Sequence, residues 1–327
     1  EERSSPETSG VDPAVLAAGR MAVVEELEDR PGLEVLGPYF GFVGPQRLAA
    51  DLRANPVYVT HVEQMARCPW QLFVRRFLGI EPPPTALGMV PDLGALVVGD
   101  VVHAVLHAIV EQVLPRETRT LEASAEAVPW PEPEVFEALL HRVAADRVQR
   151  EGLGPPSFAR VLVEKARPLV LAARQHGWPG PGAETSCVGA ELEGAVDVST
   201  LGAAPRRVHF KADRVDRSGA GLWLVDYKTG KAKTQKSLLK NVARGEALQA
   251  AAYAFGTGGE GRYLYLAGDA GGGSAVSAEA CDAELRAAFE VSVGTVLAAL
   301  GTGSFFPRLM EPGKDVSSGR CEYCEVR

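Results

Sequence analysis

Hydrophobic and polar positions follow two different periods along this chain, and the two periods separate helices from strands. Apolar residues recur at helical spacing over 94–114, 135–150, 157–176, 247–255 and 283–300. The alternation of apolar and polar residues over 187–198 and the apolar run at 262–267 are typical of strands. Helices and strands thus alternate along the chain, which predicts an α/β or mixed arrangement.

The segment 57–77, VYVTHVEQMARCPWQLFVRRF, predicts two helices separated by a proline. Thr60 with Glu63 three residues later forms a capping-box pattern, so we expect the first helix to begin there. Pro69 should interrupt it, and a second helix should follow. One face of that second helix carries Trp70, Phe73, Val74 and Phe77. Aromatic residues at this spacing are more often core residues than platforms for base stacking.

The stretch 208–230, VHFKADRVDRSGAGLWLVDYKTG, predicts a β-hairpin that organises the chain. Two apolar strand patterns flank a Ser-Gly-Ala-Gly break. A turn centred between Gly219 and Ala220 places Asp213 directly across from Asp226. Opposed residues have Cβ atoms roughly 5 Å apart, where like charges are destabilising. The pair therefore calls for a cation.

Lys228 should share a face with Asp226, because side chains alternate along a strand, and Tyr227 should point to the other side. Two carboxylates that hold a hard divalent ion, with an ammonium group nearby, suit hydrolysis of a phosphodiester. The alternative is that these are solvated residues of an edge hairpin, which is the usual status of Asp and Lys there.

Three further positions are candidates for the same site. His103 lies on the expected helix at 94–114, four residues before His107 and one turn after the small Gly99, which would admit a neighbouring backbone. A satisfied core or surface histidine is the alternative. Glu191 could face the site, or be a solvated strand residue. Gln249 and Tyr253, four apart on a helix, can pack beside it.

Composition is that of an ordinary globular protein. The chain has 327 residues, of which 46% are hydrophobic and 23% charged, and no apolar run reaches the ~20 residues of a membrane span. The net charge is −8, yet the segment 228–244 holds six basic residues and no acidic one. This run could hold a nucleic-acid backbone or be a solvated loop and helix face.

Five cysteines, with no secretory signal near the start, favour a reducing, cytoplasmic location. Cys321 and Cys324 form a CxxC pair that could hold a metal or a cluster, and Cys68 is the obvious third ligand. A zinc site completed by His61 is the alternative. Cys187 and Cys281 are the remaining two, and we expect both to be buried structural residues.

Four motifs in this order resemble the RecB-like branch of the PD-(D/E)xK nuclease superfamily: GxxxH at 99–103, DRVD at 213–216, VDYKTG at 225–230 and QxxxY at 249–253. The CPWQLF segment and the terminal CEYC further resemble AddB-type iron-sulfur nuclease domains. The resemblance implies a restriction-endonuclease-like core, a mixed central sheet flanked by helices, with helical insertions and an iron-sulfur staple joining the two ends. It covers roughly residues 57–327.

The resemblance also implies roles for individual residues. His103, Asp213, Asp226 and the carbonyl of Tyr227 match ligands to Mg²⁺ or Mn²⁺, and Lys228 matches the catalytic lysine. Gln249 and Tyr253 match a motif that supports the site and contacts DNA. Cys68, Cys321 and Cys324 match three ligands to a 4Fe-4S cluster whose fourth cysteine is not in this chain.

These matches predict a domain division and a function. Residues 1–55 would be an N-terminal extension or the end of a preceding domain, and 56–327 the nuclease domain, with a helical insertion at 115–180. The activity would be metal-dependent hydrolysis of single-stranded DNA or DNA ends, exonucleolytic, in repair or recombination. No GxxxxGK[ST] phosphate loop is present, so a helicase subunit or domain would be the partner. The alternatives are a catalytically silent iron-sulfur DNA-binding module and a zinc-stabilised structural domain.

Overall fold

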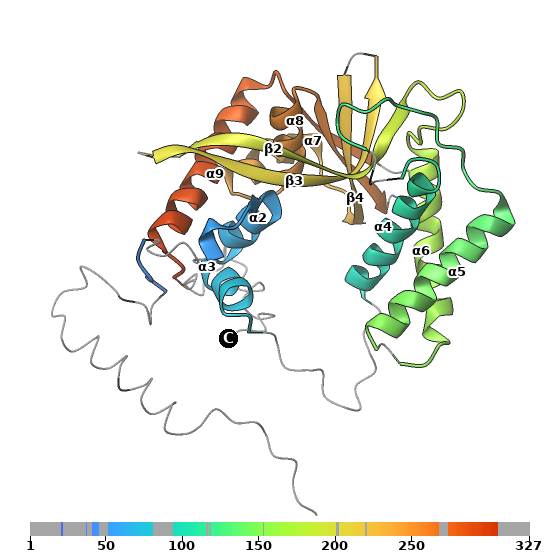
Figure 1. Cartoon of the computed structure of the whole chain (residues 1–327), viewed down its shortest axis with the longest axis horizontal. Helices are drawn as coiled ribbons and strands as arrows, with labels where there is room; N and C mark the ends of the chain where they lie inside the picture. Colours follow the sequence, from blue (N-terminus) through green and yellow to red (C-terminus); the bar gives the residue numbers. More distant parts are fainter. Residues whose placement is uncertain are drawn as a thin grey trace, which may run out of the picture.

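The computed structural model describes Met21, Gly37 and residues 41–45, 52–80 and 94–306, the last range without 116, 118, 153, 201–202, 220 and 268–273. The expectation for residues 1–55 therefore lies largely outside the described residues. The regular elements are, in chain order, η2 Leu52–Ala54, β1 Val57–Tyr58, α2 Val59–Arg67, α3 Pro69–Leu72, the π-helical segment η3 Phe73–Phe77, α4 Ala95–Glu111, α5 Pro133–Arg150, α6 Phe158–Gln175, β2 Ser186–Thr200, β3 Ala203–Ser218, β4 Gly221–Lys231, α7 Gln235–Ala243, α8 Gln249–Thr257, β5 Glu260–Ala267, β6 Ser274–Glu279 and α9 Ala283–Thr302 (Figure 1).

These strands form one mixed sheet, as the sequence predicted. Its path runs β1-β3-β4-β5-β6, and β2 pairs with β3 in addition. The β2–β3, β3–β4 and β5–β6 pairs are antiparallel, whereas β1–β3 and β4–β5 are parallel. The parallel β4–β5 pair needs a crossover connection, which α7 and α8 provide.

The central strand β3 has a break in its pairing along one edge. Strand β2 follows β3 over almost its whole length, so β1 and β4 must share the opposite edge. On that edge β1 pairs with Val208 and His209, and β4 pairs with Arg214 to Ser218. Within the described part of the chain, residues 210–213 of β3 therefore pair with no strand along that edge, and this break holds the candidate site described below.

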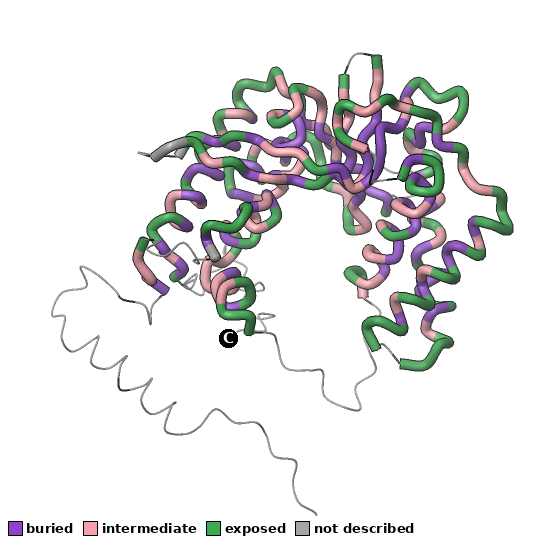
Figure 2. The backbone as a smooth tube through the Cα atoms, viewed as in Figure 1, coloured by how far each residue is buried: buried purple, intermediate pink, exposed green. Residues whose placement is uncertain are grey.

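Helices cover both faces of the sheet and bury a separate hydrophobic core on each (Figures 1 and 2). On one face α4, α5 and α6 pack over Val225, Tyr227 and Leu264. On the other face α2, α7, α8 and α9 pack over Leu224, Val215 and Phe210. Neighbouring residues of β4 contribute to opposite cores, because side chains alternate across a strand.

Helix α8 lies unusually close to the sheet. It is built from small residues, and a Cβ at Gly261 of β5 would lie 1.9 Å from the carbonyl oxygen of Ala250. A Cβ at Gly256 would lie 2.6 Å from the carbonyl oxygen of Ala195 in β2. These glycines let the backbone of α8 approach two strands, and so set the distance between α8 and the sheet next to the site.

Helix α9 is, within the described part of the chain, the single helix long and apolar enough to cross a membrane by length and composition. It also carries Glu284, Arg286 and Glu290, and it buries Leu285, Phe289 and Val293 against the core shared with the sheet. Of its most apolar stretch, 33% is buried inside the protein, so core packing accounts for part of its apolar composition.

Most of the expected helices and strands are present, and four details differ. The first helix begins at Val59 with Tyr58 as N-cap, so Thr60 is not the cap residue. Strands β1 and β6 were not predicted, because they are short or follow a glycine-rich turn. Cys187 is fully buried as expected, but Cys281 is exposed, which contradicts its prediction as a buried structural residue.

Candidate active site

The β3–β4 hairpin has the register predicted from its turn. Arg214 pairs with Val225, Val215 with Leu224, and Ser218 with Gly221. Asp213 and Asp226 occupy the next position of this register, directly beyond the last pair. The ladder stops there because β3 and β4 separate, so the two acidic residues lie where the sheet opens.

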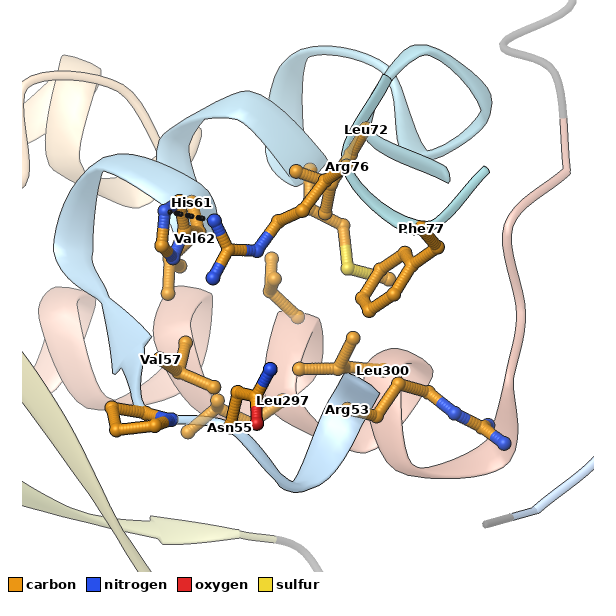
Figure 3. Close-up of a pocket in the computed structure, with 13 residues that line it drawn as sticks. Arg53, Asn55, Val57, His61, Val62, Leu72, Arg76, Phe77, Leu297 and Leu300 are labelled. Carbon is orange, nitrogen blue, oxygen red and sulfur yellow. Dashed lines mark hydrogen bonds between the residues drawn. The ribbon is translucent and has the colours of Figure 1, made fainter. Parts of the chain in front are cut away.

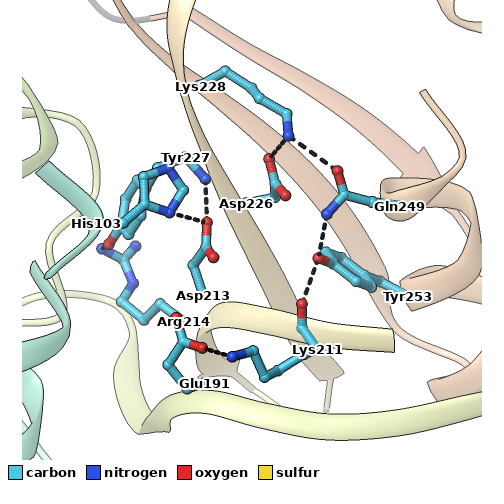
Figure 4. Close-up of polar contacts among 10 residues, drawn as sticks. All are labelled: His103, Glu191, Lys211, Asp213, Arg214, Asp226, Tyr227, Lys228, Gln249 and Tyr253. Carbon is cyan, nitrogen blue, oxygen red and sulfur yellow. Dashed lines mark hydrogen bonds and ion pairs between the residues drawn. The ribbon is translucent and has the colours of Figure 1, made fainter. Parts of the chain in front are cut away.

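At this opening the side chain of Asp213 accepts a backbone hydrogen bond that a paired strand would otherwise accept. Its Oδ2 accepts a hydrogen bond from the backbone N–H of Tyr227 (2.7 Å). The same oxygen lies 3.3 Å from Nδ1 of His103, which reaches the site from α4 in the opposite helical layer (Figure 4). The expected contact of His103 with this site is therefore present, whereas His107 pairs with Glu111 on its own helix.

Asp226 is buried, at 2% exposure, and its partner is the neighbouring lysine. Lys228 Nζ lies 2.6 Å from Asp226 Oδ2 and donates a hydrogen bond to Gln249 Oε1 (3.0 Å). The ammonium group also lies 5.3 Å from the centre of the Tyr263 ring. Tyr227 belongs to the core on the opposite face, so the predicted division of β4 into two faces is confirmed.

The first turns of α8 supply the rest of the cluster. Gln249 Nε2 lies 3.5 Å from the hydroxyl of Tyr253, and that hydroxyl donates to the carbonyl of Lys211 (2.9 Å). Lys211 lies within the unpaired part of β3, so Tyr253 satisfies a backbone acceptor that a strand would otherwise bond. Gln249 and Tyr253 thus lie on one face and beside the acidic pair, as their spacing predicted.

Gly99 has the role expected of a small residue one turn before His103. A Cβ there would lie 3.2 Å from Oγ1 of Thr229, so α4 packs directly against β4 just beyond Lys228. This close approach brings His103 within reach of Asp213. The imidazole also lies edge-on to the Tyr227 ring, with centroids 6.0 Å apart.

Glu191 lies at the site, whereas the sequence did not decide between this position and that of a solvated strand residue. It lies between Ala190 and Leu192, which pair with Arg214 and Ala212, so it stands opposite Asp213 in the β2–β3 register. Its φ of 55° is left-handed, a strained conformation for a residue with a side chain. Its carboxylate pairs with Lys211 and lines a cavity of about 280 Å³ with Asp213 and Gln249.

The charges of the cluster shift one another's protonation. Burial, aided by the negative charge of Asp213, raises the pKa of Asp226 to about 6 even though Lys228 opposes the shift. Burial also disfavours ionisation of Asp213, but the charge and hydrogen bond of His103 outweigh it and hold the pKa of Asp213 below its usual value. Burial would lower the pKa of His103, yet Asp213 raises it to about 9.

The predicted cluster ligands are only partly covered by the structure. Cys321 and Cys324 lie outside the described residues, and Cys68 is half-buried at the junction of α2 and α3. His61, the alternative zinc ligand, has both ring nitrogens engaged: Nδ1 lies 3.1 Å from the N–H of Tyr58, and Nε2 lies 2.8 Å from Arg76 Nη1 (Figure 3).

The second acidic residue of DRVD has a different function from the first. Asp216 and Arg214 form an ion pair at 2.8 Å, with side chains 1% and 3% exposed, on the face opposite the site. Arg214 also donates to the hydroxyl of Tyr227 (2.7 Å) and to the carbonyl of Gly177 (2.9 Å). This pair fixes β3, β4 and the end of α6 together, so its role is structural.

The sheet, its two helical layers and the Asp, Asp, Lys cluster at the opened hairpin define a nuclease-like α/β class. Comparison with known families agrees, since the PD-(D/E)XK nuclease superfamily matches residues 57–327. The chain belongs to this superfamily. No curated protein matches the chain. A solved structure described as "Crystal structure of SSO0001" is 14% identical over 70% of this chain and 82% of that chain, with a TM-score of 0.30, too low to add to the argument.

Members of this superfamily use divalent metal ions, which the donor groups of this site would have to hold. Among the described residues, no three His, Cys, Asp or Glu side chains converge closely enough to enclose an ion as they stand. Each carboxylate is instead compensated by a base, Asp213 by His103 and Asp226 by Lys228. The two carboxylates suit Mg²⁺ or Mn²⁺, and binding would require both carboxylates to exchange partners and His103 to lose its second ring proton.

Proposed function

We propose that this chain is a metal-dependent DNA nuclease that hydrolyses phosphodiester bonds of single strands or DNA ends. The observation that carries the proposal is the juxtaposition of Asp213 and Asp226 at the opened end of the hairpin, with Lys228 held against Asp226. A divalent ion held by these carboxylates, His103 and the carbonyl of Tyr227 would polarise the phosphoryl oxygen and acidify an attacking water.

The side chains around the pair have complementary roles in this proposal. Lys228 stabilises the negative charge that develops on the phosphoryl oxygens, and Gln249 holds its ammonium group in place. Glu191, which lines the same cavity, is a further acidic group able to join the ligand set. Tyr253 fixes the opening of the sheet through the carbonyl of Lys211.

A basic surface next to the site would bind the DNA backbone. Its members, all exposed, are Lys231, Lys233, Lys236, Lys240 and Arg244, which extend from the end of β4 along α7. Contacts of this kind are independent of the DNA sequence and weaken as the salt concentration rises. For single strands, the logarithm of the binding constant falls by about 0.7 per contacted phosphate for each unit of log salt concentration. Affinity for DNA should therefore fall steeply with ionic strength.

Several finer assignments are part of the same proposal. The RecB-like, AddB-type resemblance supports an exonuclease that works with a helicase subunit or domain in cytoplasmic DNA repair or recombination. Cys68, Cys321 and Cys324 would be three of the ligands to a 4Fe-4S cluster. Visible absorbance of anaerobically purified protein would distinguish this cluster from bound zinc.

Labelled single-stranded DNA incubated with the wild type, Lys228→Ala and Asp226→Ala in Mg²⁺, Mn²⁺ or EDTA tests the function. We expect cleavage by the wild type alone, and none in EDTA. Equal cleavage by all three proteins would rule out the proposed site. Binding of DNA by the wild type without cleavage in either metal would favour the catalytically silent iron-sulfur module.

A further inference from the structure

Helix α8 begins without a cap of its own. Its N-cap residue is Leu248, whose side chain accepts no hydrogen bond and is fully buried in the core. The preceding residue, Ala247, has a φ of 55°, in the left-handed region that alanine rarely occupies. The first N–H groups of this helix therefore need acceptors from elsewhere in the chain.

Glu63 supplies those acceptors from a different helix. Its Oε1 accepts a hydrogen bond from the N–H of Leu248 at 2.5 Å. Its carboxylate also interacts with the N–H of Gln249. Glu63 lies on α2, where the sequence suggested that it would cap its own helix, and its side chain instead caps α8, 185 residues further along the chain.

A second contact holds the two helices at this point. Gly245, in the turn before α8, has a φ of 72°, and a Cβ there would lie 2.4 Å from Cβ of Ala66. Ala66 is three residues after Glu63, on the neighbouring part of α2. The segment leading into α8 is thus packed against α2 at Gly245 and hydrogen-bonded to α2 at Leu248.

We propose that Glu63 is a positioning residue for the nuclease reaction: it holds the N-terminus of α8 so that Gln249 keeps Lys228 against Asp226. The chain of contacts is direct. Glu63 binds the amides of Leu248 and Gln249, and Gln249 Oε1 accepts from Lys228 Nζ at 3.0 Å. The catalytic part of this inference depends on the proposed function, whereas the placement of Lys228 does not.

Two readouts on the same proteins test the proposal. The first is the rate at which an acylating reagent labels Lys228, measured by mass spectrometry, and the second is kcat and KM for single-stranded DNA. We expect Glu63→Ala to accelerate labelling of Lys228 by about three- to tenfold, the equivalent of one lost hydrogen bond. We also expect kcat to fall by about tenfold to a hundredfold, with little change in KM, because the basic surface on α7 remains.

Two variants serve as controls. Glu63→Gln keeps an acceptor oxygen at the same place, so it should retain most of the activity and near-normal labelling. Gln64→Ala changes an exposed neighbour on α2 and should behave as the wild type. The charge of Glu63 also acts on Lys228 directly, and Glu63→Gln removes that charge as well. Glu63→Ala added to Gln249→Ala should therefore lower kcat no further than Glu63→Gln added to Gln249→Ala, whereas a general loss of stability would lower it further.

The outcomes separate the two claims. Unchanged labelling of Lys228 in Glu63→Ala, or damage by Glu63→Gln as large as that by Glu63→Ala, would overturn the positioning role. A lower kcat for Glu63→Ala than for Glu63→Gln when each is added to Gln249→Ala would also overturn it. If labelling responds as expected but the wild type cleaves no DNA in any metal, the positioning role stands and the nuclease function fails.

Discussion

The close approach of α8 to the sheet predicts that a single added methyl group will displace the proposed catalytic cluster. A Cβ at Gly261 would lie 1.9 Å from the carbonyl oxygen of Ala250 and 2.6 Å from its carbon, whereas real Cβ atoms essentially never come within 3.0 Å of another heavy atom. Both contacts are with backbone, so no side-chain rotation relieves them. In Gly261→Ala, α8 and β5 must therefore separate by about 1 Å.

The size of the effect follows from the position of the clash. Overpacking of this kind destabilises proteins by about 1–3 kcal/mol. Each kcal/mol lowers Tm by about 2–4 °C in a large domain, so a fall of about 2–12 °C is expected. Gln249 directly precedes Ala250. A shift of about 1 Å would disrupt the contact of Gln249 with Lys228 and lower kcat by about a hundredfold.

Thermal unfolding followed by circular dichroism, together with single-turnover cleavage of labelled DNA, measures both effects. Gly301→Ala is the matched control, because it adds the same methyl group to a helical position with no heavy atom within 4 Å. It should leave activity unchanged and raise stability slightly, since alanine is the better helix former. Unchanged Tm and kcat in Gly261→Ala would show that α8 does not set the geometry of the site.

Three further predictions concern buried charges and thiols. In EDTA, the Asp226 carboxylate should ionise near pH 6 as the pH rises, which the chemical shift of its carboxyl carbon reports by NMR. A pKa near the ~3.9 of an exposed aspartate would refute its burial beside Asp213. Replacing Arg214 by Met should lower the free energy of unfolding by about 3–5 kcal/mol, because Asp216 is left buried and unpaired. Adding Asp216→Leu should recover part of this loss, and denaturant titration measures both changes. A thiol reagent should label Cys281 rapidly in the native protein but Cys187 only after unfolding, because burial raises the pKa of the Cys187 thiol to about 12. Equal labelling rates for the two thiols would contradict the packing.

The hairpin register could be predicted from the sequence because it depends on local information alone. The turn between β3 and β4 fixes which residues are opposed, and the period of a strand fixes which face each side chain takes. Those two rules sufficed to place Asp213 across from Asp226 and Lys228 beside Asp226. The spacing of Gly99 and His103 likewise predicted how α4 approaches the sheet.

Several contacts that the sequence did not predict join distant segments. The capping of α8 by Glu63 depends on how α2 docks, which no local pattern records. A leucine at the N-cap of a helix, preceded by Ala247, is the one signal that an outside acceptor is needed. Strand β1, at two residues, is too short to show a period, and its pairing with β3 comes entirely from tertiary packing.

Glu191 shows the limit of pattern reasoning within a strand. Strict alternation over β2 would place Ala190 and Leu192 on one face, but they contribute to opposite cores. The left-handed φ of Glu191 reverses the alternation at this point and turns its carboxylate toward Lys211. Backbone strain of this kind cannot be inferred from residue types, because glycine would be the expected residue there.

Direct titration of Mn²⁺ into the protein, followed by calorimetry, tests whether the opposed carboxylates form a metal site. The wild type and Asp197→Asn, a control in which an exposed aspartate paired with Arg207 is neutralised, should bind the ion alike. Asp213→Asn and Asp226→Asn should each weaken binding by more than about tenfold. Equal Mn²⁺ affinity in all four proteins would contradict the account.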